Sequence, residues 1–82
     1  MTRKEFEERL QKETGLKLIA IPPKTNLITV EHNYEEFSYI ARGKFDNGLY
    51  FVWRVEDESF DDLFNANILF ILVQKVKLYK HE

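Results

Sequence analysis

The densest group of side chains that could carry chemistry is the acidic run 56–62, which holds five carboxylates in seven residues. Carboxylate oxygens are the ligands that hard cations prefer. The run lacks the ligand spacing of an EF-hand loop and contains no glycine. It therefore favours a solvated loop leading into a helix N-terminus, where negative charge is stabilising, and we predict no metal site and no cofactor. In an alternative role the run is an acidic docking patch for a basic partner, made of Asp57, Glu58, Asp61 and Asp62.

Acid–base and nucleophilic chemistry have few candidates in this chain. There are no cysteines, and the two histidines, His32 and His81, have no neighbouring carboxylate at a spacing typical of metal sites. The hydroxyl residues lie in no nucleophile-elbow context, and the three glycines fit turns and packing rather than a phosphate-binding loop. Because no set of residues supplies the paired roles that catalysis needs, we predict that the protein is not an enzyme and has no catalytic residues.

A second group combines cations with an aromatic ring: Arg42, Lys44, Tyr50 and Arg54. Cations beside a ring on a sheet can hold phosphates and stack a base, and mixed polar and apolar faces are also where proteins dock. The simplest alternative is a solvated sheet face whose long side chains lie over aliphatic neighbours. All three interpretations require that the four side chains share one face.

The segment 37–57 positions these four residues, because it reads as two alternating runs joined by Asp46-Asn47-Gly48 and so predicts a β-hairpin. A two-residue turn would mix Arg54 with the aromatic residues. A three-residue loop with a left-handed Gly48 separates the two sets, and since a one-residue slip turns a strand's side chains to the other face, we predict this register. The apolar face then carries Tyr39, Ala41, Gly43, Phe45, Leu49, Phe51, Trp53 and Val55. The opposite face carries Ser38, Ile40, Arg42, Lys44, Tyr50, Val52, Arg54 and Glu56.

The remaining elements are predicted from caps and periodicity. Thr2 and Glu5 form a capping box that begins a helix, and Gly15 is placed to end it. Strands are predicted over 16–21 and 27–32, and a short helix near 60–66. For residues 68–79 we predict a long strand, with a C-terminal helix as the alternative, because periodicity does not separate the two. That helix would use Leu69, Leu72, Val73, Val76 and Tyr79.

These elements predict a single small α+β domain over residues 1–82, with an N-terminal helix packed on a curved antiparallel sheet of four or five strands. The chain is 44% hydrophobic and 15% aromatic, and large rings let a short chain fold without disulfides. No apolar run approaches the roughly 20 residues of a membrane span, and the N-terminus lacks the apolar stretch of a secretory signal. We therefore expect a cytoplasmic protein with no membrane partner.

The segment Leu10–Ile19, with the sequence LQKETGLKLI, resembles the start of the small phage uracil-DNA glycosylase inhibitor family, whose members are also short, cysteine-free α+β chains. The chain then departs from that family, with Pro22-Pro23-Lys24 in place of an acidic, DNA-mimicking edge strand and a net charge of only −2. No functional residues carry over. The resemblance implies a class only: compact proteins, often phage-encoded, that occupy another protein's surface.

The leading functional prediction is a non-enzymatic protein-binding module, a small phage or mobile-element protein that binds a host protein and modulates it, as an inhibitor does. The basic group and the acidic patch would contact the partner. One alternative is a nucleic-acid-binding protein that uses the basic face of the hairpin, whose affinity would fall steeply with salt. A second alternative is a structural protein that self-associates through exposed strand edges. We expect a monomer or a weak homodimer.

Overall fold

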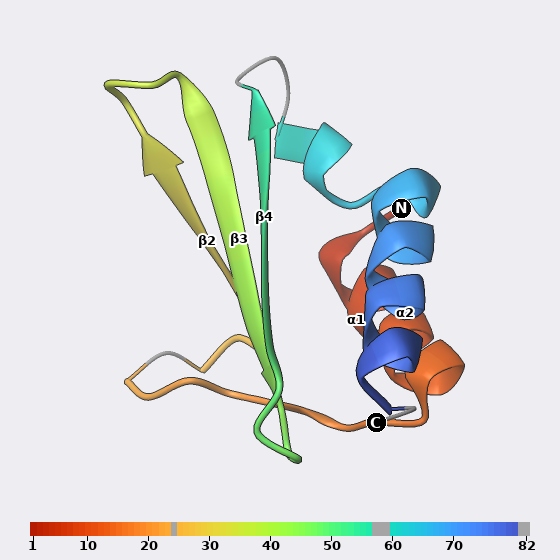
Figure 1. Ribbon diagram of the computed structural model, residues 1–82. Coiled ribbons are helices and arrows are strands. Elements are labelled where there is room, and N and C mark those ends of the chain that lie inside the picture. The colour runs from red at the N-terminus through yellow and green to blue at the C-terminus, as the bar shows by residue number, and fades with distance from the viewer. Residues whose placement is uncertain (24, 57–59, 81–82) are drawn as a thin grey trace.

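A computed structural model describes residues 1–23, 25–56 and 60–80, with the side chains of residues 61 and 80 outside the description. Within it the chain forms an N-terminal helix, a four-stranded antiparallel open sheet and a C-terminal helix, which confirms the predicted α+β class (Figure 1). The helices are α1 (Arg3–Thr14) and α2 (Ala66–Lys80), with a short 3-10 helix, η1 (Phe60–Leu63), before α2. The strands are β1 (Leu18–Ile19), β2 (Ile28–Asn33), β3 (Ser38–Phe45) and β4 (Tyr50–Glu56).

Helix α1 begins and ends at the predicted residues. The Thr2 hydroxyl accepts a hydrogen bond from the Glu5 amide at 3.1 Å, which is the N-cap bond of the predicted capping box, and it donates to the Glu5 carboxylate at 3.1 Å. Gly15 has a φ of 70°, and its amide donates to the Gln11 carbonyl, as expected of a left-handed C-terminal cap. The apolar side of α1 buries Phe6 and Leu10 completely.

Strand β3 is the centre of the sheet. One of its edges pairs with β4. Its other edge pairs with β2 and, beyond Gly43, with β1, so that β1 and β2 lie end to end along one edge. The predicted strand 16–21 is thus limited to Leu18–Ile19, because the chain leaves the edge before Pro22-Pro23 and returns at Ile28.

The β3–β4 hairpin has the predicted three-residue loop. The Phe45 amide donates to the Leu49 carbonyl at 2.8 Å, the Gly48 amide donates back to Phe45, and Gly48 has a φ of 92°. Ala41 lies opposite Trp53 and Tyr39 lies opposite Val55, as the register required. Side chains on this face pack inward, while those at alternate positions point away from the helices.

The strand predicted over 68–79 is wrong, because these residues belong to helix α2. Asn65 caps the helix: its side-chain oxygen accepts from the Ile68 amide at 3.0 Å. The buried residues recur at helical spacing, and they are Leu69, Leu72, Val73 and Val76. The short helix predicted over 60–66 is confined to Phe60–Leu63. No helix in the described ranges has the length and apolar character to cross a bilayer.

Both helices lie on the same side of the sheet (Figure 1), and the core lies between them and the inner face. The Phe6 ring lies 5.5 Å from Trp53 and 5.4 Å from Phe64, measured between ring centroids. The Trp53 indole also donates to the Leu63 carbonyl at 3.2 Å. This packing assigns Trp53 to the core, and no helix of the described residues covers the opposite face of the sheet.

Candidate functional site

The uncovered face of the sheet carries the four residues of the predicted basic group. Arg42 and Lys44 come from β3, and Tyr50 and Arg54 come from β4. Their common orientation follows from the hairpin register, because outward positions alternate with core positions along both strands. The face is partly apolar: Tyr50 is 65% exposed and Val52 is 56% exposed. We call these outward residues of β2, β3 and β4 the outer face.

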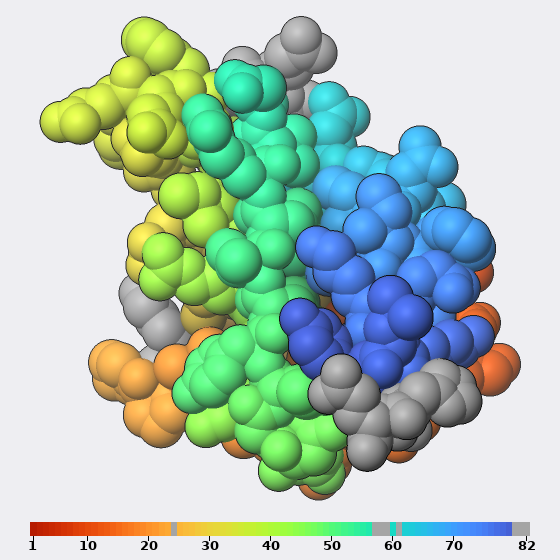
Figure 2. All heavy atoms as spheres, viewed as in Figure 1, coloured from red at the N-terminus to blue at the C-terminus, as the bar shows by residue number. Residues whose placement is uncertain are grey.

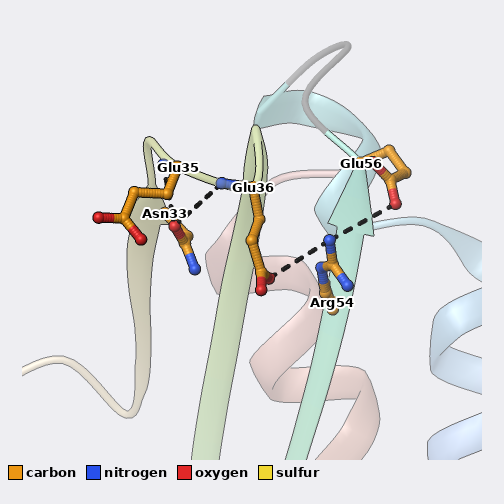
Figure 3. A network of polar contacts seen from close by, with 5 residues as sticks. All are labelled: Asn33, Glu35, Glu36, Arg54 and Glu56. Carbon is orange, nitrogen blue, oxygen red and sulfur yellow. Dashed lines mark hydrogen bonds and ion pairs between the residues drawn. The ribbon is translucent and has the colours of Figure 1, made fainter.

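Arg54 is held by two carboxylates at one end of the outer face (Figure 3). Its guanidinium lies 3.4 Å from the Glu36 carboxylate and 3.7 Å from the Glu56 carboxylate. Glu36 is placed by the β2–β3 turn, where the Asn33 side-chain oxygen accepts from the amides of residues 35 and 36. Because all three side chains are well exposed, the ion pairs add little stability, but they reduce the positive charge that Arg54 offers a ligand.

The other two cations have different surroundings. The Lys44 ammonium lies 5.0 Å from the centroid of the Tyr50 ring, a cation–π arrangement that keeps both side chains along the sheet. Arg42 lies between Thr29 and Val52 across the two ladders, and in the described part of the chain no carboxylate lies within ion-pair distance of it. Of the three, Arg42 offers the most available charge.

The outer face is mixed rather than basic. Besides Arg42, Lys44 and Arg54, it carries Glu31 from β2 and Glu56 from β4, and the neighbouring turn adds Glu36. Cations therefore do not outnumber carboxylates among the described residues of this surface. Two hollows, of about 610 and 550 Å³, share Arg42 and Glu31 among their lining residues. Such a surface presents charge of both signs around apolar side chains.

The predicted acidic patch is described only in part. Asp57 and Glu58 lie outside the described residues, as does the side chain of Asp61. Asp62 is exposed in η1, and its carbonyl accepts a hydrogen bond from the Asn65 side chain. Among the described residues there is no group of three or more histidine, aspartate or glutamate side chains that could hold a metal ion. The structure therefore does not bring the acidic patch and the basic group into one described site.

A third surface was missed by the sequence reasoning. The larger hollow continues around the free edge of β4 to helix α2, where Leu72, Lys75, Val76 and Tyr79 line it. Figure 2 shows this side of the molecule, with β4 running beside α2. Large apolar side chains of α2 remain exposed, including Ile71 and Leu78. The helical spacing of Ile71 and Leu78 could have revealed this surface, but only once residues 68–79 were treated as a helix.

Comparison with known proteins adds no relative: no protein-family model, curated protein or solved structure matches the chain.

Proposed function

We propose that the chain is a non-enzymatic protein-binding module whose outer sheet face docks on a partner protein. The observation that carries the proposal is the one-sided layering, in which both helices cover the inner face and leave Tyr50 and Val52 more than half exposed opposite them. Exposed apolar side chains ringed by polar ones are typical of protein interfaces. The resemblance to the glycosylase-inhibitor family implies the class of partner, which is a protein of the cell that hosts the phage or mobile element.

The charge balance of the outer face supports a protein partner over a nucleic acid. Binding to a phosphate backbone depends on uncompensated cations, whereas here Arg54 is paired with two carboxylates and Glu31 lies near Arg42. A protein partner can use both signs, because complementary charges fix orientation and exclude wrong partners. Arg42 and Lys44, on the central strand, are the residues we expect to contribute most to partner choice.

The test is a double charge reversal at Arg42 and Lys44. Arg54 is left unchanged because its charge is already paired with Glu36 and Glu56, so reversing it would add repulsion among three carboxylates rather than remove an available cation. Both chosen residues lie on β3, so the strand edges are unchanged. We expect the R42E/K44E variant to keep the wild-type melting temperature and to lose the partner that the wild type captures from host lysate.

The matched control reverses two exposed cations on α1, Lys4 and Arg9, which changes the net charge equally on the helical side. The proposal requires that this control still captures the partner. Equal recovery by both double variants would contradict the assignment of the outer face. Binding of an oligonucleotide at low salt that weakens steeply as salt rises would favour the nucleic-acid alternative instead.

A further inference from the structure

The free edge of β4 lacks proline, bulges and inward-pointing charges, and its charged residues, Arg54 and Glu56, lie on the outer face. In the described part of the chain β4 pairs only with β3, and its seven residues keep an uninterrupted register without proline. Natural edges are commonly blocked by proline, bulges or inward-pointing charges. The inward residues of β4 are instead Phe51, Trp53 and Val55. This edge is therefore competent to accept another strand.

The groups that β4 presents at this edge follow from the hairpin. Phe45 and Leu49 form a hydrogen-bonded pair, and such pairs alternate with non-hydrogen-bonded pairs along an antiparallel ladder. The backbone groups that hydrogen-bond to β3 are therefore those of Phe51, Trp53 and Val55. The backbone N–H and C=O groups of Tyr50, Val52 and Arg54 point to the free edge. Their side chains lie on the outer face, so a strand added here would extend that face.

Helix α2 presents an apolar stripe on the same side of the molecule. Lys75 and Tyr79 line the hollow together with Tyr50 and Val52, which places this side of α2 above the β4 edge. Ile71, Lys75 and Leu78 share the stripe because residues three and four apart lie on one helix face. Ile71 is 52% exposed and Leu78 is 72% exposed. The unpaired edge and the apolar stripe therefore meet at Lys75, the stripe residue that lines the hollow beside β4.

We propose that this surface binds a second copy of the same chain, with β4 pairing antiparallel to β4 and α2 packing against α2. A twofold axis through an edge-to-edge strand pair keeps both helix layers on one side of the joined sheet, so strand edge and helix stripe are buried by the same operation. Seven strand residues span about 23 Å and fifteen helical residues about 22 Å. With two layers about 20 Å deep in all, the contact buries on the order of 1,000 Å² in total, the area a biological interface needs.

The β4 side chains favour a particular self-pairing. When Val52 lies opposite Val52 of the second copy, Tyr50 lies opposite the second copy's Arg54, and both pairs have outward-pointing backbone groups. Arginine over a tyrosine ring is favourable. A shift by two residues in each strand would instead bring the two Arg54 side chains together, and like charges directly opposite are destabilising. Lys75 is the one charged residue within the described stripe, and in the dimer it would lie near Lys75 of the second copy.

The decisive variant is Val52→Pro. Proline removes an N–H that points to the free edge and is tolerated on edge strands, so the monomer keeps its fold. Sedimentation of the wild type over about 5–500 µM, a range that covers interfaces of modest size, should show a concentration-dependent dimer. We expect Val52→Pro to weaken that dimer at least about tenfold, with circular dichroism unchanged. We expect Lys75→Ala to strengthen it.

A second pair of variants keeps the proposal testable should the proline disturb the strand. Ile71→Lys places a charge in the stripe and is expected to weaken the dimer. Phe70→Lys makes the same change at a more exposed apolar residue about 100° further round α2, and should leave the dimer intact. A wild type that stays monomeric throughout, or a dimer that survives both Val52→Pro and Ile71→Lys, overturns the proposal. A monomer that adds an extended peptide of another protein to β4 would overturn it as well.

This inference does not depend on the proposed function. It concerns the β4 edge and the α2 stripe, whereas partner capture is tested through outward side chains of β3. Because Val52 also belongs to the outer face, partner capture is compared in Ile71→Lys, which changes the stripe alone. Loss of the dimer with retained capture, or the reverse, would therefore identify which of the two is wrong.

Discussion

Gly43 lies directly opposite Phe51 across the β3–β4 ladder, and the ring of Phe51 occupies the space that a side chain at position 43 would need. A Cβ built on Gly43 would lie 2.2 Å from the ring Cζ. The phenyl ring reaches the core only because the facing residue has no side chain. In turn, the Phe51 ring packs 5.3 Å from Phe45 and 5.7 Å from Trp53, measured between centroids.

Gly43→Ala should therefore destabilise the domain through overpacking, by about 1–3 kcal/mol in the free energy of unfolding. Urea denaturation measures the change. Adding Phe51→Leu should recover part of the loss, because the smaller side chain vacates the clash and the two sites are coupled. Additive losses in the double variant would show that the two residues do not compete for the same space.

Trp53→Ala should lower the free energy of unfolding by about 3–5 kcal/mol. We expect a value near the lower end of this range because the ring is only partly buried. The loss combines the packing against Phe6 with the hydrogen bond to the Leu63 carbonyl. Trp53→Phe keeps most of the packing and should cost about 1 kcal/mol for the lost hydrogen bond. Thermal and urea unfolding of the two variants separate the contributions. A melting temperature unchanged in Trp53→Ala would contradict the register of the hairpin.

Ser38 and Thr14 are buried hydroxyl residues with opposite expected effects. Ser38 is fully buried at the start of β3, and its Oγ has no hydrogen-bond partner among the described residues. The Thr14 hydroxyl donates to the Leu10 carbonyl at 2.6 Å. Ser38→Ala should leave stability unchanged or raise it by up to about 1 kcal/mol, because it removes a desolvated polar group. Thr14→Ala should lower stability by about 1 kcal/mol, and equal losses in calorimetry would refute the distinction.

Glu7 makes stability depend on pH. Partial burial on α1 raises the pKa of the Glu7 carboxyl above its ordinary value, an effect that Arg3 opposes and Glu8 reinforces. A carboxyl with a raised pKa binds its proton more tightly in the folded state. The ionised form therefore destabilises the fold above this pKa, and the penalty disappears as pH falls below the ordinary value.

Glu7→Gln should accordingly raise the melting temperature near pH 7, and the gain should shrink towards pH ~4. The control is Glu13→Gln, which makes the same charge change at an exposed position on the same helix. Melting curves collected between these pH values test the sign. A gain that grows on acidification would show that burial is not the dominant influence on Glu7.

The parts of the fold that local chemistry determines were predictable from sequence. The capping box of Thr2 and Glu5, the left-handed Gly15, and the loop ending at Gly48 each depend on residues within a few positions of one another. Their hydrogen bonds form as expected. The hairpin register was also predictable, because only one alignment separates core from outer-face side chains.

The sequence pattern did not distinguish helix α2 from a strand. An apolar run such as 68–73 fits a buried strand as well as a buried helix, and the separating signal was the single cap residue Asn65. The strand prediction placed these residues in the sheet, where Ile71 and Leu78 do not share a face. The exposed stripe that they form on the helix was therefore not predicted. The pairing of Arg54 with Glu36 needs both the register and the β2–β3 turn, so no local pattern could show it.

The hairpin also separates positions by parity. In β3 and β4 the odd-numbered residues pack on the inner side of the sheet, and the even-numbered residues lie on the outer side. Apart from buried Ser38, even positions can therefore change with little cost to folding, while odd positions cannot. Evolution can redirect what the outer face recognises without rebuilding the domain. A laboratory library restricted to residues 40, 42, 44, 50, 52 and 54 would explore new specificities on an unchanged scaffold.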